Sequence, residues 1–165
     1  MEKEKRDLFS VEKRLFGGDY ESAVIEQWKT CVDAASSITE KRNTANSIFI
    51  TINTALFAVI TFTLDLRSIF LSVIGILISC LWLMLLANYK RLNTVKYDII
   101  NEMEELLPLS PFKAEWERLL KDGKYAGLTR IEKAIPIVYI VLFGLAILFP
   151  VIKWLLPLVC SCVST

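Results

Sequence analysis

The sequence predicts an all-α membrane protein with three transmembrane helices, two of which continue as long cytoplasmic helices. Three apolar runs, residues 47–64, 68–88 and 135–158, interrupt an otherwise charged chain of 165 residues. Each run is long enough, at 1.5 Å per residue, to cross a hydrocarbon core of about 30 Å. Within the three runs, Lys153 near the end of the third is the one charged residue.

The distribution of basic residues predicts the topology. Residues 1–46 carry eight Lys and Arg and residues 89–133 carry nine, whereas the link between the first two runs carries one and the last six residues carry none. The positive-inside rule therefore places the N-terminus in the cytoplasm and the C-terminus outside. Trp82 and Tyr89 are expected in the inner interfacial belt and Trp154 in the outer one.

These patterns divide the chain into seven segments. In order they are a flexible N-terminal segment (1–18), a cytoplasmic helix (19–46), transmembrane helix 1 (47–64), transmembrane helix 2 (68–88), a cytoplasmic helical segment (89–133), transmembrane helix 3 (135–158) and an extracytoplasmic tail (159–165). The charged N-terminus is not followed by an apolar run until residue 47, so we expect no cleavable signal peptide.

The cytoplasmic helices are expected to continue directly into the membrane. Asp19 is the predicted N-cap of the first helix. Neither Pro nor Gly occurs from residue 20 to 46, so this helix and span one should form one rod. Span two has one Gly and no Pro up to residue 107, which predicts a second long helix that ends at Pro108.

The rest of the cytoplasmic segment is predicted as a short helix between turns. Ser110 as N-cap and Pro111 at the first helical position should start a helix over 112–120. Asp122-Gly123 should turn the chain. The helix-capping pair Thr129 and Glu132 has capping-box spacing and should start span three.

Two prolines and three charged clusters receive ordinary interpretations. Pro136 is tolerated in the first turns of span three, and Pro150 is expected to kink this helix. The acidic cluster at 102–105 is interpreted as a solvated helix face. Contact with anionic lipid headgroups accounts for Lys41-Arg42 and Lys90-Arg91.

Span one is the most polar of the three, and polar groups in hydrocarbon need partners or water. The candidate pore-lining or helix-interface residues are Asn46, Ile50, Thr51, Asn53, Thr54, Phe57 and Thr61. Two interpretations stay open. These side chains either hydrogen-bond to neighbouring helices or line a pore, with Asn53 as a hydrophilic ring and Phe57 or Ile50 as a gate.

Spans two and three look less polar. The predicted helix-packing residues are the small side chains Ser68, Ser72, Gly75 and Ser79, which allow two backbones to approach closely. Span three, with Tyr139, Phe143 and Phe149, is expected to face lipid.

The composition of the chain argues against most kinds of catalysis and of metal binding. The chain has no histidine, which removes the commonest general base and metal ligand. The four cysteines lack the spacing of a zinc site. No phosphate-binding loop or nucleophile–base pair occurs, and the 19 basic residues nearly balance 18 acidic ones. We therefore expect no enzymatic activity, no cofactor, no metal and no nucleic-acid partner.

Three stretches carry a resemblance to a known family. They are 41–56 (KRNTANSIFITINTAL), 106–116 (LLPLSPFKAEW) and 127–136 (GLTRIEKAIP). Together they resemble the RipA-like family of small octameric bacterial inner-membrane proteins. The resemblance implies a homo-oligomeric ring in a bacterial inner membrane and implies no substrate.

Two functional hypotheses follow. In the first, the chain assembles into a ring, with itself and membrane lipid as partners, and the central face of span one acts as a channel or as a membrane-permeability effector. In the second, the ring is a non-conducting scaffold or adaptor. Its cytoplasmic helices, including Trp28 and Trp116, would then dock a cytoplasmic protein.

Overall fold

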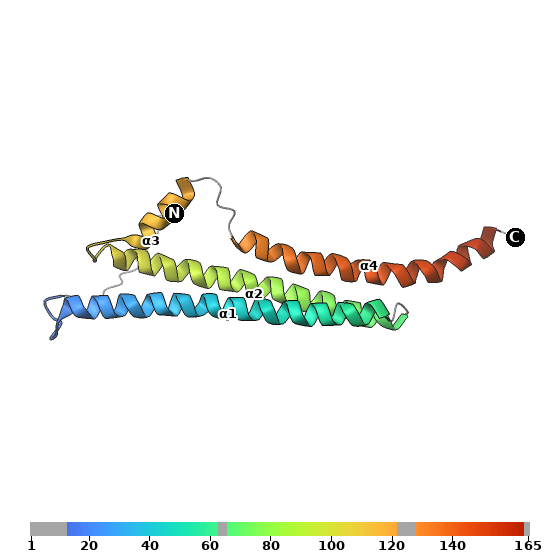
Figure 1. Cartoon of the computed structure of the whole chain (residues 1–165), viewed down its shortest axis with the longest axis horizontal. Coiled ribbons are helices and arrows are strands. Elements are labelled where there is room, and N and C mark those ends of the chain that lie inside the picture. The colour runs from blue at the N-terminus through green and yellow to red at the C-terminus, as the bar shows by residue number, and fades with distance from the viewer. Residues whose placement is uncertain (1–12, 63–65, 122–127, 164–165) are drawn as a thin grey trace.

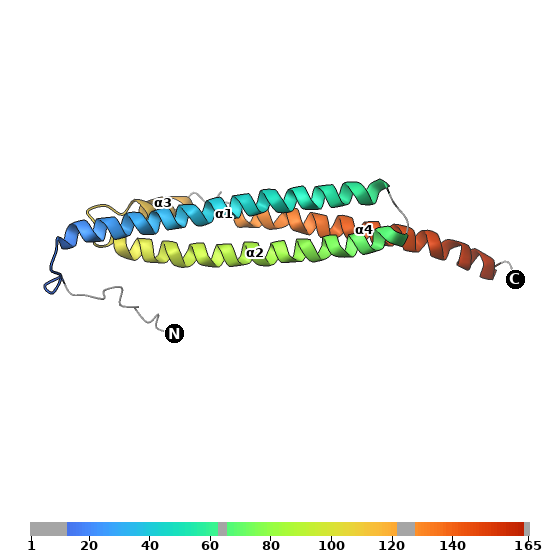
Figure 2. The same cartoon turned by 90° about the horizontal axis from the view of Figure 1, so that it is seen from below.

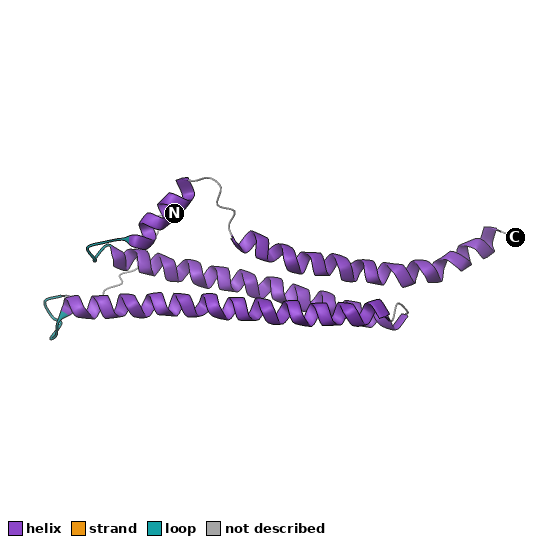
Figure 3. Cartoon of the chain, in the orientation of Figure 1, coloured by secondary structure: helices purple, strands orange, loops and turns teal. Residues whose placement is uncertain are grey.

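The computed structural model describes residues 13–62, 66–121 and 128–163. This part of the chain forms four helices and no strand: α1 (Tyr20–Phe62), α2 (Leu66–Glu104), α3 (Pro111–Lys121) and α4 (Leu128–Val163). Figures 1 and 3 show three long rods lying side by side and the short α3 near one end. The predicted all-α fold is therefore confirmed.

Each of the two predicted rods is one uninterrupted helix. α1 runs through 43 residues and α2 through 39, so α1 is about 64 Å long at 1.5 Å per residue. Three helices, with described ranges of Tyr20–Phe62, Arg67–Glu104 and Arg130–Leu155, are long and apolar enough to cross a membrane. The three apolar runs of the sequence lie in these three helices, apart from residues 63 and 64, which are outside the described residues.

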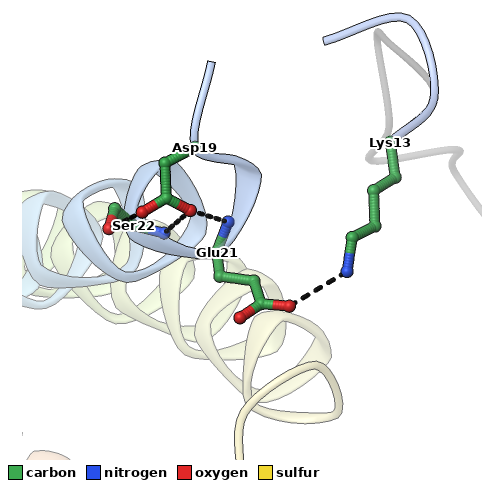
Figure 4. A network of polar contacts seen from close by, with 4 residues as sticks. All are labelled: Lys13, Asp19, Glu21 and Ser22. Carbon is green, nitrogen blue, oxygen red and sulfur yellow. Dashed lines mark hydrogen bonds and ion pairs between the residues drawn. The ribbon is translucent and has the colours of Figure 1, made fainter. Parts of the chain in front are cut away.

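Asp19 caps α1 as the sequence predicts. Its Oδ1 accepts hydrogen bonds from the backbone N–H groups of Glu21 (3.1 Å) and Ser22 (3.3 Å), and its Oδ2 accepts one from the Ser22 hydroxyl (2.6 Å; Figure 4). These bonds, with that of the Ser22 hydroxyl contributing most, hold the pKa of Asp19 below its usual value of 3.8.

Acid is therefore expected to loosen the start of α1. A carboxyl whose pKa is lowered by folding stabilises the helix above its unfolded pKa, and this contribution is lost as pH falls through the folded value. The protection factors of the backbone amides at residues 20–24, which correct for the intrinsic slowing of exchange in acid, should fall in the wild type between neutral pH and a pH well below 3.8. Asp19→Ala should show low protection factors at both pH values; equal acid sensitivity in both proteins would contradict the cap.

α2 is the central helix of the bundle. It packs along α1 on one side and along α4 on another, whereas α1 and α4 touch each other little. Figure 2 shows α1 and α2 running antiparallel, with α4 alongside them and extending past the end of α1. A small apolar core of Ile60, Phe143 and Ala146 joins the three helices.

The region between α2 and α3 differs slightly from the prediction. α2 ends at Glu104, and a turn follows in which the amides of Leu106 and Leu107 bond to the carbonyls of Met103 and Glu104. α3 then begins at Pro111, as its place at the first helical position predicts. The predicted turn at Asp122-Gly123 and most of the N-terminal segment lie outside the described residues.

α4 curves toward its C-terminal end (Figure 1), as expected for a helix that contains Pro150. Pro136 and Pro150 are both buried. α4 already includes Leu128, so Thr129 lies within its first turn and does not precede the helix. The side chain of Thr129 lies outside the described ones.

Candidate functional site: polar contacts between the helices

Asn53 lies at the centre of the α1–α2 contact. Its side chain is fully buried. Its Nδ2 donates to the carbonyl oxygen of Phe49 (2.8 Å), and its Oδ1 accepts a hydrogen bond from the Ser79 hydroxyl (3.0 Å). The amide of Asn53 is therefore used within one subunit, as a bond between helices.

Asn46 makes a second bond of this kind two turns away. Its Oδ1 accepts a hydrogen bond from Trp82 Nε1 at 2.8 Å. The indole ring of Trp82 stacks on Phe49, with centroids 5.5 Å apart and planes at 5°. Trp82 is 1% exposed, so its expected place in the interfacial belt is wrong. Its ring fills the contact and its N–H satisfies a polar group of α1.

The exposed polar face of α1 consists of small side chains that recur every three or four residues. We call it the hydroxyl seam; it comprises Ser47, Thr51, Thr54, Ala58 and Thr61, all exposed in the protomer. Thr51 donates to the carbonyl of Ser47 (2.9 Å) and Thr61 to that of Ala58 (2.7 Å). These hydroxyls are therefore satisfied without water.

α4 approaches the hydroxyl seam at one point. Thr54 Oγ1 lies 2.6 Å from the Tyr139 hydroxyl oxygen, which makes a hydrogen bond between α1 and α4. Phe57 is half-buried, and its ring meets Phe143 edge to face at 5.9 Å. Ile50 is 37% exposed. Of the seven candidates on span one, the structure thus places three, Asn46, Asn53 and Thr54, in hydrogen bonds between helices.

The small residues of span two face the interior. Ser68, Ser72, Gly75 and Ser79 are all buried. A Cβ atom built on Gly75 would lie 2.5 Å from two ring atoms of Phe143, closer than side chains tolerate. The missing side chain of Gly75 therefore makes room for an aromatic ring from α4, which explains how α2 and α4 come close.

The expectation that span three faces lipid is wrong for its inner side. Phe143 is fully buried, and Tyr139 is half-buried between Trp82 and Phe143. Phe149 is 54% exposed, as a lipid-facing residue should be. Because nearly every residue of this span is apolar, hydropathy gives no periodic signal to mark which side packs on α2.

A buried ion pair joins α1 to α4 just before the start of their apolar runs. Arg42 Nε lies 3.6 Å from Glu132 Oε1, and the two side chains are 10% and 12% exposed. The headgroup interpretation is therefore wrong for Arg42, although Lys41 is exposed. Glu132, predicted as a helix-capping residue, contacts a different helix. A charge buried next to a membrane span needs such a partner.

Glu104 is a second buried charge that the sequence interpretation missed. Its carboxylate is fully buried and accepts the backbone N–H groups of Phe112 and Lys113, each at 3.3 Å. A carboxylate at this position satisfies the free amides at the start of α3 and complements the helix dipole. The solvated-face interpretation holds for the exposed Glu102 and Glu105 and is wrong for Glu104.

Glu104→Ala is expected to release the start of α3. The variant leaves the two part-buried amides of Phe112 and Lys113 without this acceptor, which costs at most about 1–3 kcal/mol. Limited proteolysis or amide exchange should show faster opening of residues 110–121, with helices α1 and α4 unchanged. Glu102→Ala, on an exposed residue of the same acidic cluster, is the matched control, and equal protection in both variants would argue against the cap.

The arrangement binds helices to one another and fixes the start of α3 at the end of α2. Among the described residues, no group of three His, Cys, Asp or Glu side chains could hold a metal ion. The sequence signal that could have found the buried ion pair and the buried Glu104 is weak. Arg42 and Glu132 are opposite charges at the same edge of two spans, and Glu104 precedes a proline-started helix by a short turn.

Comparison with known proteins gives one match. The model of the octameric membrane protein family (8xMP) matches residues 25–152, a range that contains α2, α3 and most of α1 and α4. Neither the curated proteins nor the solved structures gave a match. The family name and the three apolar helices agree with the resemblance seen in the sequence. The chain belongs to the octameric membrane protein family and is a homo-oligomeric membrane protein.

Proposed function

We propose that the octamer is a membrane-embedded scaffold, and not an enzyme, that holds a rigid ring of cytoplasmic helices for a protein partner. The observation that carries the proposal is the use of polar groups in span one. Asn46 and Asn53 bond to α2 and Thr54 contacts α4. Amides used in this way support helix association better than a wet pore lining.

The cytoplasmic layer supports the same proposal. Phe112 of α3 packs against Trp28 of α1 (6.1 Å between centroids) and Tyr97 of α2 (5.9 Å). With the Glu104 cap, these contacts fix α3 on the two rods. The outer side of α3 exposes Trp116 (52%) and Leu120 (61%), two large apolar side chains of the kind that protein interfaces use.

In-cell photo-crosslinking tests the scaffold. A photoreactive amino acid at Leu120 should give a product with one cytoplasmic protein in a constant ratio to the octamer. The same photoreactive amino acid in place of Phe70, which is exposed near the other end of α2, is the control. It should give products with lipid or with another copy of the chain. Leu120→Glu should abolish the partner's co-purification and leave the octamer intact. Self-crosslinks alone from Leu120 would rule the scaffold out.

A channel is the second candidate, and the exposed hydroxyl seam favours it. Eight copies in one orientation can be related only by a rotation axis along the membrane normal. If eight α1 helices surrounded that axis at a spacing of about 10 Å, they would leave a central opening. The seam would then line it with hydroxyl groups, with Phe57 or Ile50 as a gate.

Ion flux into liposomes separates the two candidates. If the protein is a scaffold, liposomes that contain the purified octamer and a potassium-sensitive dye should remain impermeable to potassium ions. A leak that falls when Thr51 and Thr54 are both replaced by valine would instead support the channel, including a membrane-permeability effector. Liposomes without protein and without detergent give the background ion leak.

Location and orientation complete the proposal. We propose a bacterial inner membrane, with the N-terminus and α3 in the cytoplasm and the C-terminus outside, because the basic residues gather at one end of the three spans. Membrane lipid then covers the exposed apolar face of α4. Thiol labelling of single cysteines at residues 29 and 153, with and without membrane permeabilisation, tests the orientation.

A further inference from the structure

α2 exposes an apolar ridge that lies on the far side of the helix from α1. The α2 ridge comprises Phe70, Ile74, Leu77, Leu81 and Met84, between 47% and 76% exposed. Leu77 and Leu81 each lie two residues from Ser79, which bonds to α1. Two residues correspond to about 200° around a helix, so the ridge points away from the subunit's own α1.

The hydroxyl seam of α1 points away from α2 in turn. Thr54 follows Asn53 by one residue, or about 100°, and lies on the side of α4. A cyclic ring needs two different surfaces on each subunit, one for each neighbour. The seam, with small side chains, and the ridge, with large ones, are two such surfaces on different sides of the α1–α2 pair.

The two surfaces also lie at matching depths. Hydrogen bonds put Asn53 of α1 level with Ser79 of α2, and Thr39 of α1 level with Asn93 of α2. The number of residues from Thr39 to Asn53 on α1 equals the number from Ser79 to Asn93 on α2. Thr54 is therefore nearly level with Leu77. A rotation about the membrane normal keeps every residue at its own depth, so the same register holds between neighbouring subunits.

The charges at the cytoplasmic ends of both surfaces are opposite. Glu40 continues the three- and four-residue spacing of the hydroxyl seam along α1, and Arg91 continues the same spacing of the α2 ridge. Both side chains are exposed, and neither forms an ion pair within the described part of the protomer. Glu40 adjoins Thr39 and Arg91 lies two residues before Asn93, so the register places the two charges at about the same level.

We propose that neighbouring subunits of the octamer meet through the α2 ridge of one subunit and the hydroxyl seam of the next, with Glu40 facing Arg91. Large side chains of α2 enter the spaces above the small residues of α1, and α1 and α2 alternate around the ring. This inference rests on membership of the octameric family and is independent of the scaffold proposal.

Cysteine crosslinking in native membranes tests the contact. In a chain with its four cysteines replaced by alanine, Thr54→Cys and Leu77→Cys are placed on separately tagged, co-expressed copies. Mild oxidation should join the two tags, and the double variant on one chain should give a ladder of products up to the octamer. Ile52→Cys, exposed on another side of α1, replaces Thr54→Cys as control and should give no ladder.

The charges give a second test. Glu40→Arg and Arg91→Glu should each lower the fraction of octamer in native mass spectra severalfold, and the double variant should restore it. A product between two Thr54→Cys copies, which places the seam against another α1 or at the axis, would overturn the proposal. So would single charge variants that assemble as well as the wild type.

Discussion

Arg42→Met is expected to cost about 3–5 kcal/mol of stability, because it leaves the Glu132 carboxylate buried without its partner. Both side chains lie nearly out of solvent between α1 and α4. The thermal midpoint of the octamer in detergent, followed by tryptophan fluorescence, should fall clearly. The midpoint should fall although the mass of the octamer at low temperature stays unchanged, because the ion pair lies within one subunit.

Two further variants separate the ion pair from mere loss of a large side chain. Lys41→Met changes the exposed neighbouring charge and should leave the midpoint unchanged. The double variant Arg42→Met/Glu132→Leu replaces the pair by apolar groups and should recover most of the stability. A double variant as unstable as Arg42→Met alone would mean that Arg42 acts through packing and not through Glu132.

Gly75→Ala is expected to destabilise the α2–α4 contact by about 1–3 kcal/mol, the usual cost of overpacking. The added methyl group would overlap the Phe143 ring, which is fully buried and has little room to move. Either the ring or the whole of α4 must shift outward. The denaturation midpoint should fall, and the near-ultraviolet circular dichroism of the aromatic cluster should weaken.

Gly144→Ala is the matched control. Gly144 is also in a membrane helix, but a Cβ atom built on it meets nothing within 4 Å. This variant should be neutral or slightly stabilising, because alanine favours helix more than glycine does. If both variants were destabilised to the same extent, the loss of stability at Gly75 would not come from its contact with Phe143.

Local sequence signals predicted the helices of this protein well. Asp19 starts α1 because a side-chain oxygen satisfies the free amides of a first turn whatever the tertiary structure is. Pro111 starts α3 for a similarly local reason. The rods of α1 and α2 followed from the absence of helix breakers. Each of these features depends on neighbours in sequence.

The contacts between helices were predictable only where the sequence marks a face. The small residues of α2 stand out from an apolar background, and all four are buried. Phe143 stands among other large apolar residues of α4, so its burial against Gly75 had no sequence signal. Trp82 fits a membrane interface equally well by type and depth, and only its bond to Asn46 decides its place.

The sequence by itself determined the number of candidate spans, the starts of α1 and α3 and the family, because hydropathy, helix caps and motif stretches are properties of continuous segments. Only the tertiary structure decided which charges are buried. Arg42, Glu104 and Glu132 look like ordinary surface charges in sequence, yet each finds its partner on another helix. The physical reason is that the free energy of a charge depends on partners that folding brings together from distant parts of the chain.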